Sequence, residues 1–201
     1  MADTNKFLEL FKPCYNDALR FTRSLCSGKD KDITNDVLQQ SLLQAIEGLP
    51  SLKDESKFKF WLFSIITNVF YTSARRHFWS SKLSLSSDEV KVDIPDVFDR
   101  YKQTEERMLL GEALSRLKDR DRAAILLFEI GNFSIQEIAD AQNEKTVSAV
   151  KSRLSRTRQK LKSVIINLEK NGKFNSKNPQ TINVNLENET SELISGIKSN
   201  K

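Results

Sequence analysis

Apolar residues in the first fifty positions fall at three- and four-residue steps, separated by polar ones, which is the spacing of amphipathic α-helices. One helix is predicted from Phe7 to a stop near Gly28. A second is predicted to begin at Thr34 or Asn35, either of which suits an N-cap, and to end at Gly48. The chain therefore opens with two helices that each bury one face.

A third and longer helix is predicted from a cap at Ser56 to the basic run at 75–77. Its aromatic and aliphatic residues are more often core than contact surface, so packing is expected for Trp61, Ile65 and Val69. The aromatics nearest the basic end are the better candidates for exposed contacts, namely Tyr71, Phe78 and Trp79.

Periodicity is lost over residues 81–103, which are rich in serine and acidic residues and include Pro95, so this segment is predicted to be a linker. Two further helices are predicted at 105–117 and 120–130, followed by a turn at Gly131 and Asn132. The asparagine-rich segment 167–201 has few large apolar residues and is expected to be a flexible polar tail.

Residues 134–161 carry two short helical patterns separated by a polar turn. Ser134 and Glu137 form a predicted capping box for the first, and Thr146 is the expected cap of the second. Asn143 in the turn suits the left-handed conformation that glycine more often supplies. Such a pair, with a strongly basic second helix, is typical of the helix-turn-helix motif.

The second helix of this motif is predicted to bury Val147, Val150, Leu154 and Leu161. Burial of these residues leaves four polar side chains on the outer side of the helix, namely Lys151, Ser152, Ser155 and Arg156. Basic side chains can bind guanine edges or phosphates in a major groove, and serines permit close approach. Farther along, phosphate contacts are expected from Arg158, Lys160 and Lys162. A basic, solvated helix of a bundle remains the alternative.

Glycine and proline are scarce, with 6 and 4 residues, and helix formers dominate the chain. The expected fold class is all-α, with two small helical domains, each around its own core, joined by a flexible linker. The expected boundaries are 1–80 for the first domain, 81–103 for the linker, 104–166 for the second domain and 167–201 for the tail.

The net charge is +5, and its distribution is more informative than its size. No acidic residue occurs between Lys57 and Ser87, and seven lysine or arginine residues with no acidic one occur between Lys145 and Lys162. Solvated helix faces usually mix both signs. Two separate basic surfaces therefore favour a long polyanionic partner, such as nucleic acid.

Catalytic and metal chemistry find little support in the composition. Cys14 and Cys26 are expected to lie roughly 18 Å apart on one helix, too far for a disulfide, and to be buried, reduced thiols of a cytoplasmic protein. His77 is the only histidine, so neither a zinc site nor a nucleophile–base pair is expected. We expect no enzyme activity, no metal or other cofactor, and no membrane insertion.

Four segments together resemble extracytoplasmic-function (ECF) sigma factors, the small promoter-recognition subunits of bacterial RNA polymerase. FKFWLFSIITNVFYTSARR (58–76) and NDVLQQSLLQAI (35–46) are similar to sigma region 2 of that family. LSRLKDRDRAAILLFEIGNFSIQEIADA (114–141) and VKSRLSRTRQKL (150–161) resemble its region 4. The resemblance implies a region 2 bundle, a region 4 helix-turn-helix and a role in transcription initiation.

The resemblance also implies a role for individual residues. Core RNA polymerase, through the clamp helices of its largest subunit, would contact Asp36, Gln39 and Gln40. A flipped base of the −10 element of promoter DNA would meet the loop from Lys53 to Lys57 together with Asn68. Promoter phosphates would meet Arg75 and Arg76. The −35 element would meet Lys151, Ser152, Ser155 and Arg156. An anti-sigma factor is a further expected partner.

The chain departs from the family pattern at several positions. Gln40 stands where an acidic residue is usual, and Ser155 stands where a basic or aromatic one is usual. The helix-turn-helix turn carries one extra residue. It lacks the usual Leu-Gly and apolar residue and has Gln142, Asn143 and Lys145 instead.

Two alternative functions would require sequence features different from those of a sigma factor. A stand-alone helix-turn-helix regulator that binds an operator as a dimer would use 1–80 as a sensor or dimerisation domain. An enzyme acting on nucleic acid would need clustered carboxylates or a nucleophile with its base, and neither basic block contains a carboxylate.

Overall fold

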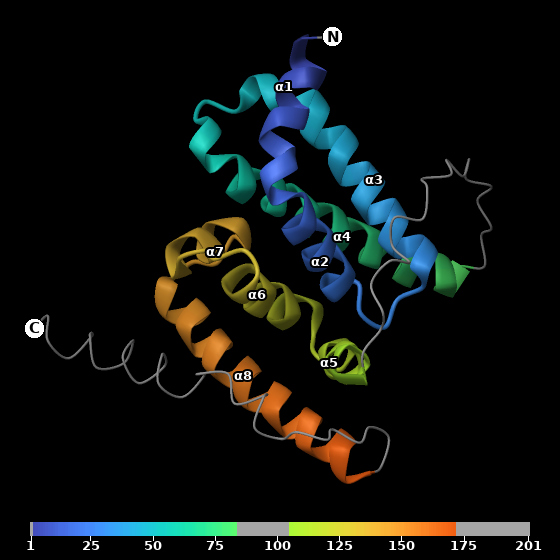
Figure 1. Cartoon of the computed structure of the whole chain (residues 1–201). Helices are drawn as coiled ribbons and strands as arrows, with labels where there is room; N and C mark the ends of the chain where they lie inside the picture. Colours follow the sequence, from blue (N-terminus) through green and yellow to red (C-terminus); the bar gives the residue numbers. More distant parts are fainter. Residues whose placement is uncertain (1, 84–104, 172–201) are drawn as a thin grey trace, which may run out of the picture.

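The computed structural model describes residues 2–83 and 105–171, with side chains described from 5 to 75 and from 105 to 171 (Figure 1). Within these ranges every regular element is helical, which confirms the all-α class. Most of the expected linker and the tail from 172 onward lie outside the described residues. No helix within the described ranges is long and apolar enough to cross a membrane.

The N-terminal half consists of α1 (Ala2–Phe11), α2 (Tyr15–Leu25), α3 (Lys31–Gly48) and α4 (Phe58–Leu83). Single 3₁₀ turns at Lys12–Cys14, Leu49–Ser51 and Glu55–Lys57 connect them. Phe21 of α2 stacks on Phe63 of α4 with 4.7 Å between ring centroids, and both side chains are fully buried. Of the residues expected to pack, Val69 is buried, whereas Trp61 and Ile65 are partly buried against this core.

Three boundaries in this half differ from the sequence prediction. The first predicted helix is divided into α1 and α2 at Pro13, because proline lacks an N–H and cannot continue a helical ladder. The next helix begins at Lys31, earlier than the proposed caps Thr34 and Asn35. Asp54, not Ser56, caps the turn before α4, since its carboxylate accepts from the Ser56 amide at 3.0 Å.

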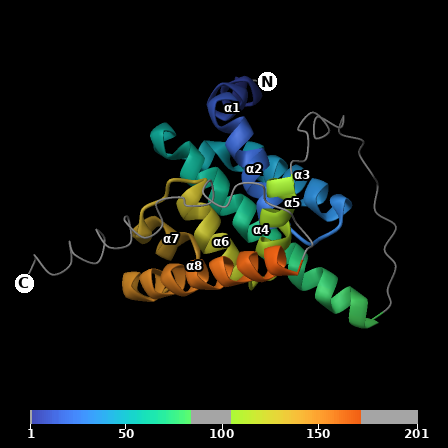
Figure 2. The same cartoon turned by 60° about the horizontal axis from the view of Figure 1, so that its bottom comes forward.

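The C-terminal half consists of α5 (Glu105–Ser115), α6 (Asp119–Glu129), α7 (Ile135–Ala141) and α8 (Val147–Lys170). The long α8 packs against α5, α6 and α7 along its length (Figure 2). A small cluster of Leu109, Ala113 and Leu168 joins the far end of α8 to α5. These four helices hold the basic segment 145–162 at one side of the molecule.

The two halves pack against each other instead of forming the two independent cores that were expected. One continuous cluster of buried residues runs through both, and α6 contacts α2 and α4 while α7 contacts α4 (Figure 1). Phe133, from the loop between α6 and α7, lies 5.2 Å from Phe60 and 5.8 Å from Phe63, ring centroid to ring centroid. Local periodicity carries no information about this long-range contact.

The two cysteines are buried and unpaired, as predicted. Burial raises the pKa of Cys26 to about 11 and also raises the pKa of Cys14. Both thiols are therefore protonated at neutral pH, and a protonated, buried thiol is a poor nucleophile.

Candidate nucleic-acid interface

A polar stripe runs along the exposed side of α4 and consists of Asn68, Thr72 and Arg75. Steps of four and three residues place successive side chains on one helix face. The Arg75 guanidinium donates to the Thr72 hydroxyl at 3.5 Å, so these two side chains lie side by side. This α4 stripe offers an amide, a hydroxyl and a positive charge over about 10 Å of helix.

The loop before α4 has a defined shape. Asp54 accepts from both the backbone amide and the hydroxyl of Ser56, at 3.0 and 2.6 Å, and these hydrogen bonds lower the pKa of Asp54. Glu55 pairs with Lys6 of α1 at 2.6 Å. Lys57 is exposed at the end of this loop. The loop therefore leads directly into the start of α4, and the α4 stripe begins at Asn68, eleven residues after Lys57.

The basic end of α4 is only partly described. Arg76, Phe78 and Trp79 belong to the helix, but their side chains lie outside the described part of the chain. Tyr71 was expected as an exposed contact and is instead partly buried between the two halves, where its hydroxyl accepts from the Gln142 side chain at 3.1 Å. Burial raises the pKa of Tyr71 to about 12.

The expected polymerase-binding residues lie on α3. Asp36 and Gln40 are exposed and stand one helical turn apart, while Gln39 is half-buried. Val37 and Leu38, between them in sequence, are buried and fix this orientation of α3. Asp36 and Gln40 therefore face away from the core on one polar surface.

The helix-turn-helix has the caps that its sequence predicts. The Ser134 hydroxyl accepts from the Glu137 amide at 3.2 Å, and the Glu137 carboxylate accepts from the Ser134 amide at 2.8 Å. Thr146 accepts from the Ala149 amide at 3.1 Å and begins α8. Asn143 has a φ of 50° and supplies the predicted left-handed residue of the turn.

The outward face of α8 also follows the prediction. Val150 and Leu154 are buried, and Val147 and Leu161 are partly buried. On the opposite side Ser152, Ser155 and Arg156 are exposed, and Lys151 is half-buried beside them. These four residues, Lys151, Ser152, Ser155 and Arg156, are called the α8 face below. Small side chains between two positive charges let a helix backbone approach a groove closely.

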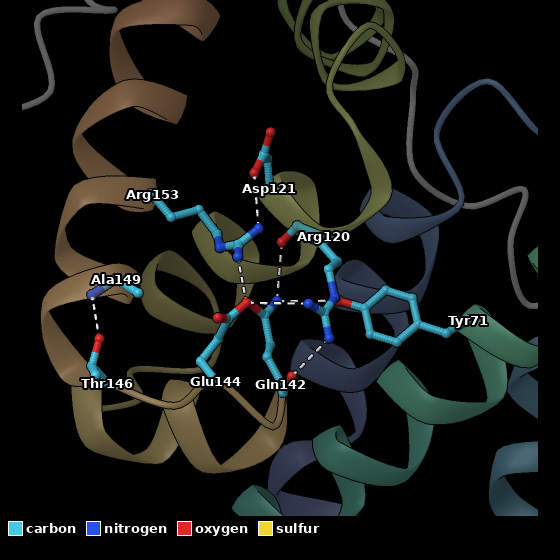
Figure 3. Close-up of polar contacts among 8 residues, drawn as sticks. All are labelled: Tyr71, Arg120, Asp121, Gln142, Glu144, Thr146, Ala149 and Arg153. Carbon is cyan, nitrogen blue, oxygen red and sulfur yellow. Dashed lines mark hydrogen bonds and ion pairs between the residues drawn. The ribbon is translucent and has the colours of Figure 1, made fainter.

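Arg153, on the inward side of α8, anchors the turn of the motif (Figure 3). Its guanidinium pairs with Asp121 of α6 at 3.2 Å and, more closely, with Glu144 of the turn. Arg120 pairs with the same Glu144 carboxylate at 3.3 Å and donates to the Gln142 carbonyl at 3.0 Å. These contacts tie α6, the turn and α8 together and so set the orientation of α8.

Arg158 has a different environment from the phosphate contact that was expected. Its guanidinium pairs with Glu129 of α6 at 3.0 Å and lies 4.8 Å from the ring centroid of Phe128. Only 9% of the side chain is exposed. The cause is helical phase: Arg158 stands four residues after the buried Leu154 and three before the partly buried Leu161, so it lies near the face of α8 that packs on α6.

Sequence reasoning missed three structurally central residues, Arg122, Gln142 and Arg153. Gln142 is 1% exposed, and its amide nitrogen donates to the Arg120 carbonyl at 3.0 Å as well as to Tyr71. One signal was available for Gln142, because it stands where the family pattern has an apolar residue. Arg122 and Arg153 gave none, since each also bonds to a residue far away in sequence, Ser27 for Arg122 and Asp121 for Arg153.

The proposed site residues form separate surfaces. Lys57, Asn68 and Arg75 lie on or next to α4, Asp36 and Gln40 lie on α3, and the α8 face belongs to the C-terminal half. The molecule thus presents two basic helical surfaces and one polar, partly acidic one.

Comparison with known protein families matches both halves. Residues 10–80 match sigma-70 region 2, and residues 107–161 match sigma-70 region 4. The first match covers the segment that an operator-binding dimer would use as a sensor, so that alternative is not favoured.

Individual relatives agree with these matches. The chain is 30% identical over 157 residues to the ECF RNA polymerase sigma factor SigM of Bacillus subtilis, covering 78% of this chain and 93% of that protein. It is 29% identical over 159 residues to SigM of Mycobacterium tuberculosis, covering 79% of this chain and 76% of that one.

Solved structures show the same architecture. The sigma factor RpoE from Bartonella quintana, in complex with the anti-sigma factor NepR, matches 82% of this chain and 98% of its own, with 26% identity and a TM-score of 0.61. The fold of CnrH, solved with the cytosolic domain of CnrY, is also similar, with 22% identity and a TM-score of 0.55. The two region matches, the coverage of SigM and the shared fold together establish that this chain belongs to the ECF family of RNA polymerase sigma factors.

Proposed function

We propose that this protein is a transcription initiation factor that binds core RNA polymerase and directs it to promoters through binding alone, without catalysing a reaction. The observation that best supports this function is that one chain presents two exposed surfaces. These are the α4 stripe and the α8 face, and the helix of the latter has its own N-cap. The working division is 1–80 for region 2, 81–103 for the linker, 104–166 for region 4 and 167–201 for a polar tail.

The α8 face is proposed to bind the −35 element as duplex DNA. Lys151 and Arg156 carry the charges for guanine edges or adjacent phosphates, and Ser152 and Ser155 leave room for the groove wall. Arg153 acts as a positioning residue, because its ion pairs hold the start of α8 against α6 and the turn. Arg158 is also a positioning residue, because it pairs with Glu129 of α6, and it is left out of the proposed DNA contacts.

The α4 stripe is proposed to act on the −10 element once its bases unstack. Asn68 offers an amide that can donate to and accept from a base edge, and Lys57 stands at the end of the preceding loop. Arg75 and Arg76 are assigned to phosphates. Unstacking costs a few kcal/mol per step, which base contacts and charge neutralisation offset.

Polymerase binding is assigned to Asp36, Gln39 and Gln40 of α3, against the clamp helices of the largest subunit. With both halves tied to one chain, binding of one promoter element raises the effective concentration of the other half at its own element. The protein is proposed to act in the cytoplasm, where core polymerase and DNA are found, and to have an anti-sigma factor as a regulatory partner.

Run-off transcription on a promoter library tests the function directly. Core polymerase supplemented with this protein is expected to give transcripts that share a −10 and a −35 sequence and that core polymerase alone does not give. No protein-dependent transcript from any promoter, with folded protein and active core, would contradict the proposal.

The docking assignment has its own test. Asp36→Arg reverses a charge on the α3 surface and is expected to weaken core-polymerase binding in a pull-down without loss of helicity. Glu9→Arg makes the same charge change on the exposed side of α1 and serves as the matched control. Equal binding of core polymerase by both variants would contradict the assignment of the polymerase contact to α3.

A further inference from the structure

One side of α5 carries exposed apolar side chains. Met108 is 49% exposed and Leu110 is 44% exposed, while Leu109 between them in sequence is buried in a cluster with Leu168 of α8. Successive residues are turned by about 100° around a helix, so Gly111 lies between Met108 and Leu110 on the side opposite Leu109. These three residues, Met108, Leu110 and Gly111, are called the α5 outer face below.

The glycine leaves this surface flat. An added Cβ at Gly111 would meet no other part of the described chain within 4 Å, so no packing contact there requires a glycine. A glycine inside a helix is less stable than an alanine. Single exposed apolar side chains are ordinary on protein surfaces, but two that flank a bare glycine leave room for a side chain from elsewhere.

The chain leaves α8 close to the α5 outer face. Leu168, in the last turn of α8, packs on Leu109 near the start of α5 (Figure 2). Two packed helices have axes about 8 to 10 Å apart, and three extended residues span about 10 Å. Residue 174, three positions after the last described residue, can therefore reach from the end of α8 to α5.

Phe174 has the side chain that this surface can accept. It is the first large apolar residue after α8, and it is the only aromatic residue from there to residue 201. A flat ring can lie on Gly111 with Met108 and Leu110 on either side. A methionine sulfur also makes favourable contacts with aromatic rings.

The charges around Phe174 suit the start of α5. Lys173 and Lys177 flank it with no acidic residue between them, whereas the first turn of α5 carries the two acidic residues Glu105 and Glu106. Exposed ion pairs contribute little to stability. The ring contact is therefore expected to supply most of the binding, and the charges to guide the segment toward α5.

We propose that residues 172–177 fold back over the start of α5 and that Phe174 packs on the α5 outer face. The contact is one of this chain with itself, and it goes beyond the proposed function without depending on it. The region 4 match ends at residue 161, so this segment and the last turns of α8 are an addition to that region. The segment would cover an apolar surface that is otherwise open to a second copy or to another protein.

Thiol labelling of the full chain tests the proposal. Met108→Cys places a thiol on the α5 outer face, and Leu8→Cys places one on α1 at a position that is 56% exposed. The thiol at position 108 is expected to react with a thiol-reactive dye more slowly than the one at position 8, on the order of tenfold, because it reacts only when the contact opens. Cys14 and Cys26 are buried and contribute little in either variant.

Phe174→Ser identifies the cover. Added to Met108→Cys, it is expected to raise the labelling rate to that of Leu8→Cys. Leu186→Ser removes an apolar side chain farther along the same tail and should leave the protection of position 108 unchanged. Circular dichroism confirms that all variants are folded.

A charge reversal is the second arm of the test. Lys173→Glu together with Lys177→Glu should raise the labelling rate at position 108, by a smaller factor than Phe174→Ser does. Lys198→Glu together with Lys201→Glu makes the same charge change at the far end of the tail and should leave the rate unchanged.

Equal labelling of Met108→Cys and Leu8→Cys in the otherwise unchanged chain would overturn the proposal. Protection that survives Phe174→Ser would overturn it as well, because another segment would then be the cover. Protection that weakens on dilution would overturn it in favour of a second copy. The labelling needs neither polymerase nor DNA, so its failure and the failure of the proposed function are separate results.

Discussion

The two basic helices α4 and α8 use their charges differently. On α4, Lys59 pairs with Asp17 of α2 at 2.8 Å, and Arg75 is exposed on the α4 stripe. On α8, Arg153 and Arg158 are both drawn into ion pairs with α6 or the turn, and Arg156 is exposed between them. Two arginines of α8 thus hold the helix in place, while Arg156 remains on its outward face.

This difference shows why a count of basic residues overstates a DNA-binding surface. Arg153 and Arg158 flank the buried line of Val150, Leu154 and Thr157, so their long side chains reach back to acids on neighbouring elements. Arg156 projects from the opposite side of the helix. Helical phase relative to the core, and not charge density, separates a positioning arginine from one that can meet a phosphate.

The largest effect is expected from Arg153→Ala. It leaves the Asp121 and Glu144 carboxylates, both mostly shielded, without their shared partner. Removing one member of such a pair should lower the free energy of unfolding by about 2 to 3 kcal/mol and weaken upstream DNA binding. Urea denaturation and duplex binding measure the two losses.

The matched control for that change is Arg156→Ala on the same helix, which should leave the urea midpoint unchanged. If Arg153→Ala kept wild-type stability, or if both variants lost stability equally, the division between positioning and exposed arginines on α8 would be wrong.

A smaller effect is expected from Arg156→Ala on DNA recognition. Loss of one specific contact at a base edge or phosphate should weaken binding to the −35 element by about 1 to 3 kcal/mol and relax selectivity there. Lys160→Ala, farther along α8, should weaken binding to all sequences alike. Competition binding with matched and mismatched duplexes distinguishes these results, and undiminished selectivity in Arg156→Ala would remove it from the proposed contacts.

The smallest effect concerns the ion pair that restrains α4. Hydrogen bonds from Lys59 and Arg20 lower the pKa of Asp17 in the folded protein. The Asp17 carboxylate therefore contributes its full stabilisation at pH values above the pKa that it has in the unfolded chain, near 4. That stabilisation is lost as the pH falls through the lower pKa of Asp17 in the folded protein. Asp17→Asn should cost well under about 1 kcal/mol at neutral pH. Acid titration of the unfolding midpoint should show a shallower decline below pH 4 in the variant than in the wild type.

Sequence reasoning was most successful where the determining interaction is local. The Ser134–Glu137 box, the Thr146 cap and the left-handed Asn143 each depend on residues within three positions of one another, and all three predictions are confirmed. The break at Pro13 was also local and could have been predicted from the missing N–H.

The contacts between the halves could not be predicted in the same way. Tyr71 and Gln142 are 71 residues apart, and Arg122 and Ser27 are 95 apart. Periodicity shows that a side chain faces a core but not which distant element completes it. Tyr71 was for this reason expected on the surface, and the two halves were expected to have separate cores. The roles assigned to Asn68, Arg75 and the α8 face stay predictions.

The most direct test of the account compares Asn68→Ala with Arg156→Ala on one promoter. Binding to upstream duplex DNA reports on α8, and permanganate reactivity of unpaired thymines at the −10 element reports on α4. Arg156→Ala is expected to lose duplex binding, whereas Asn68→Ala is expected to keep duplex binding and lose permanganate reactivity. Normal opening by Asn68→Ala, or loss of the same step in both variants, would contradict the division of promoter recognition between α4 and α8.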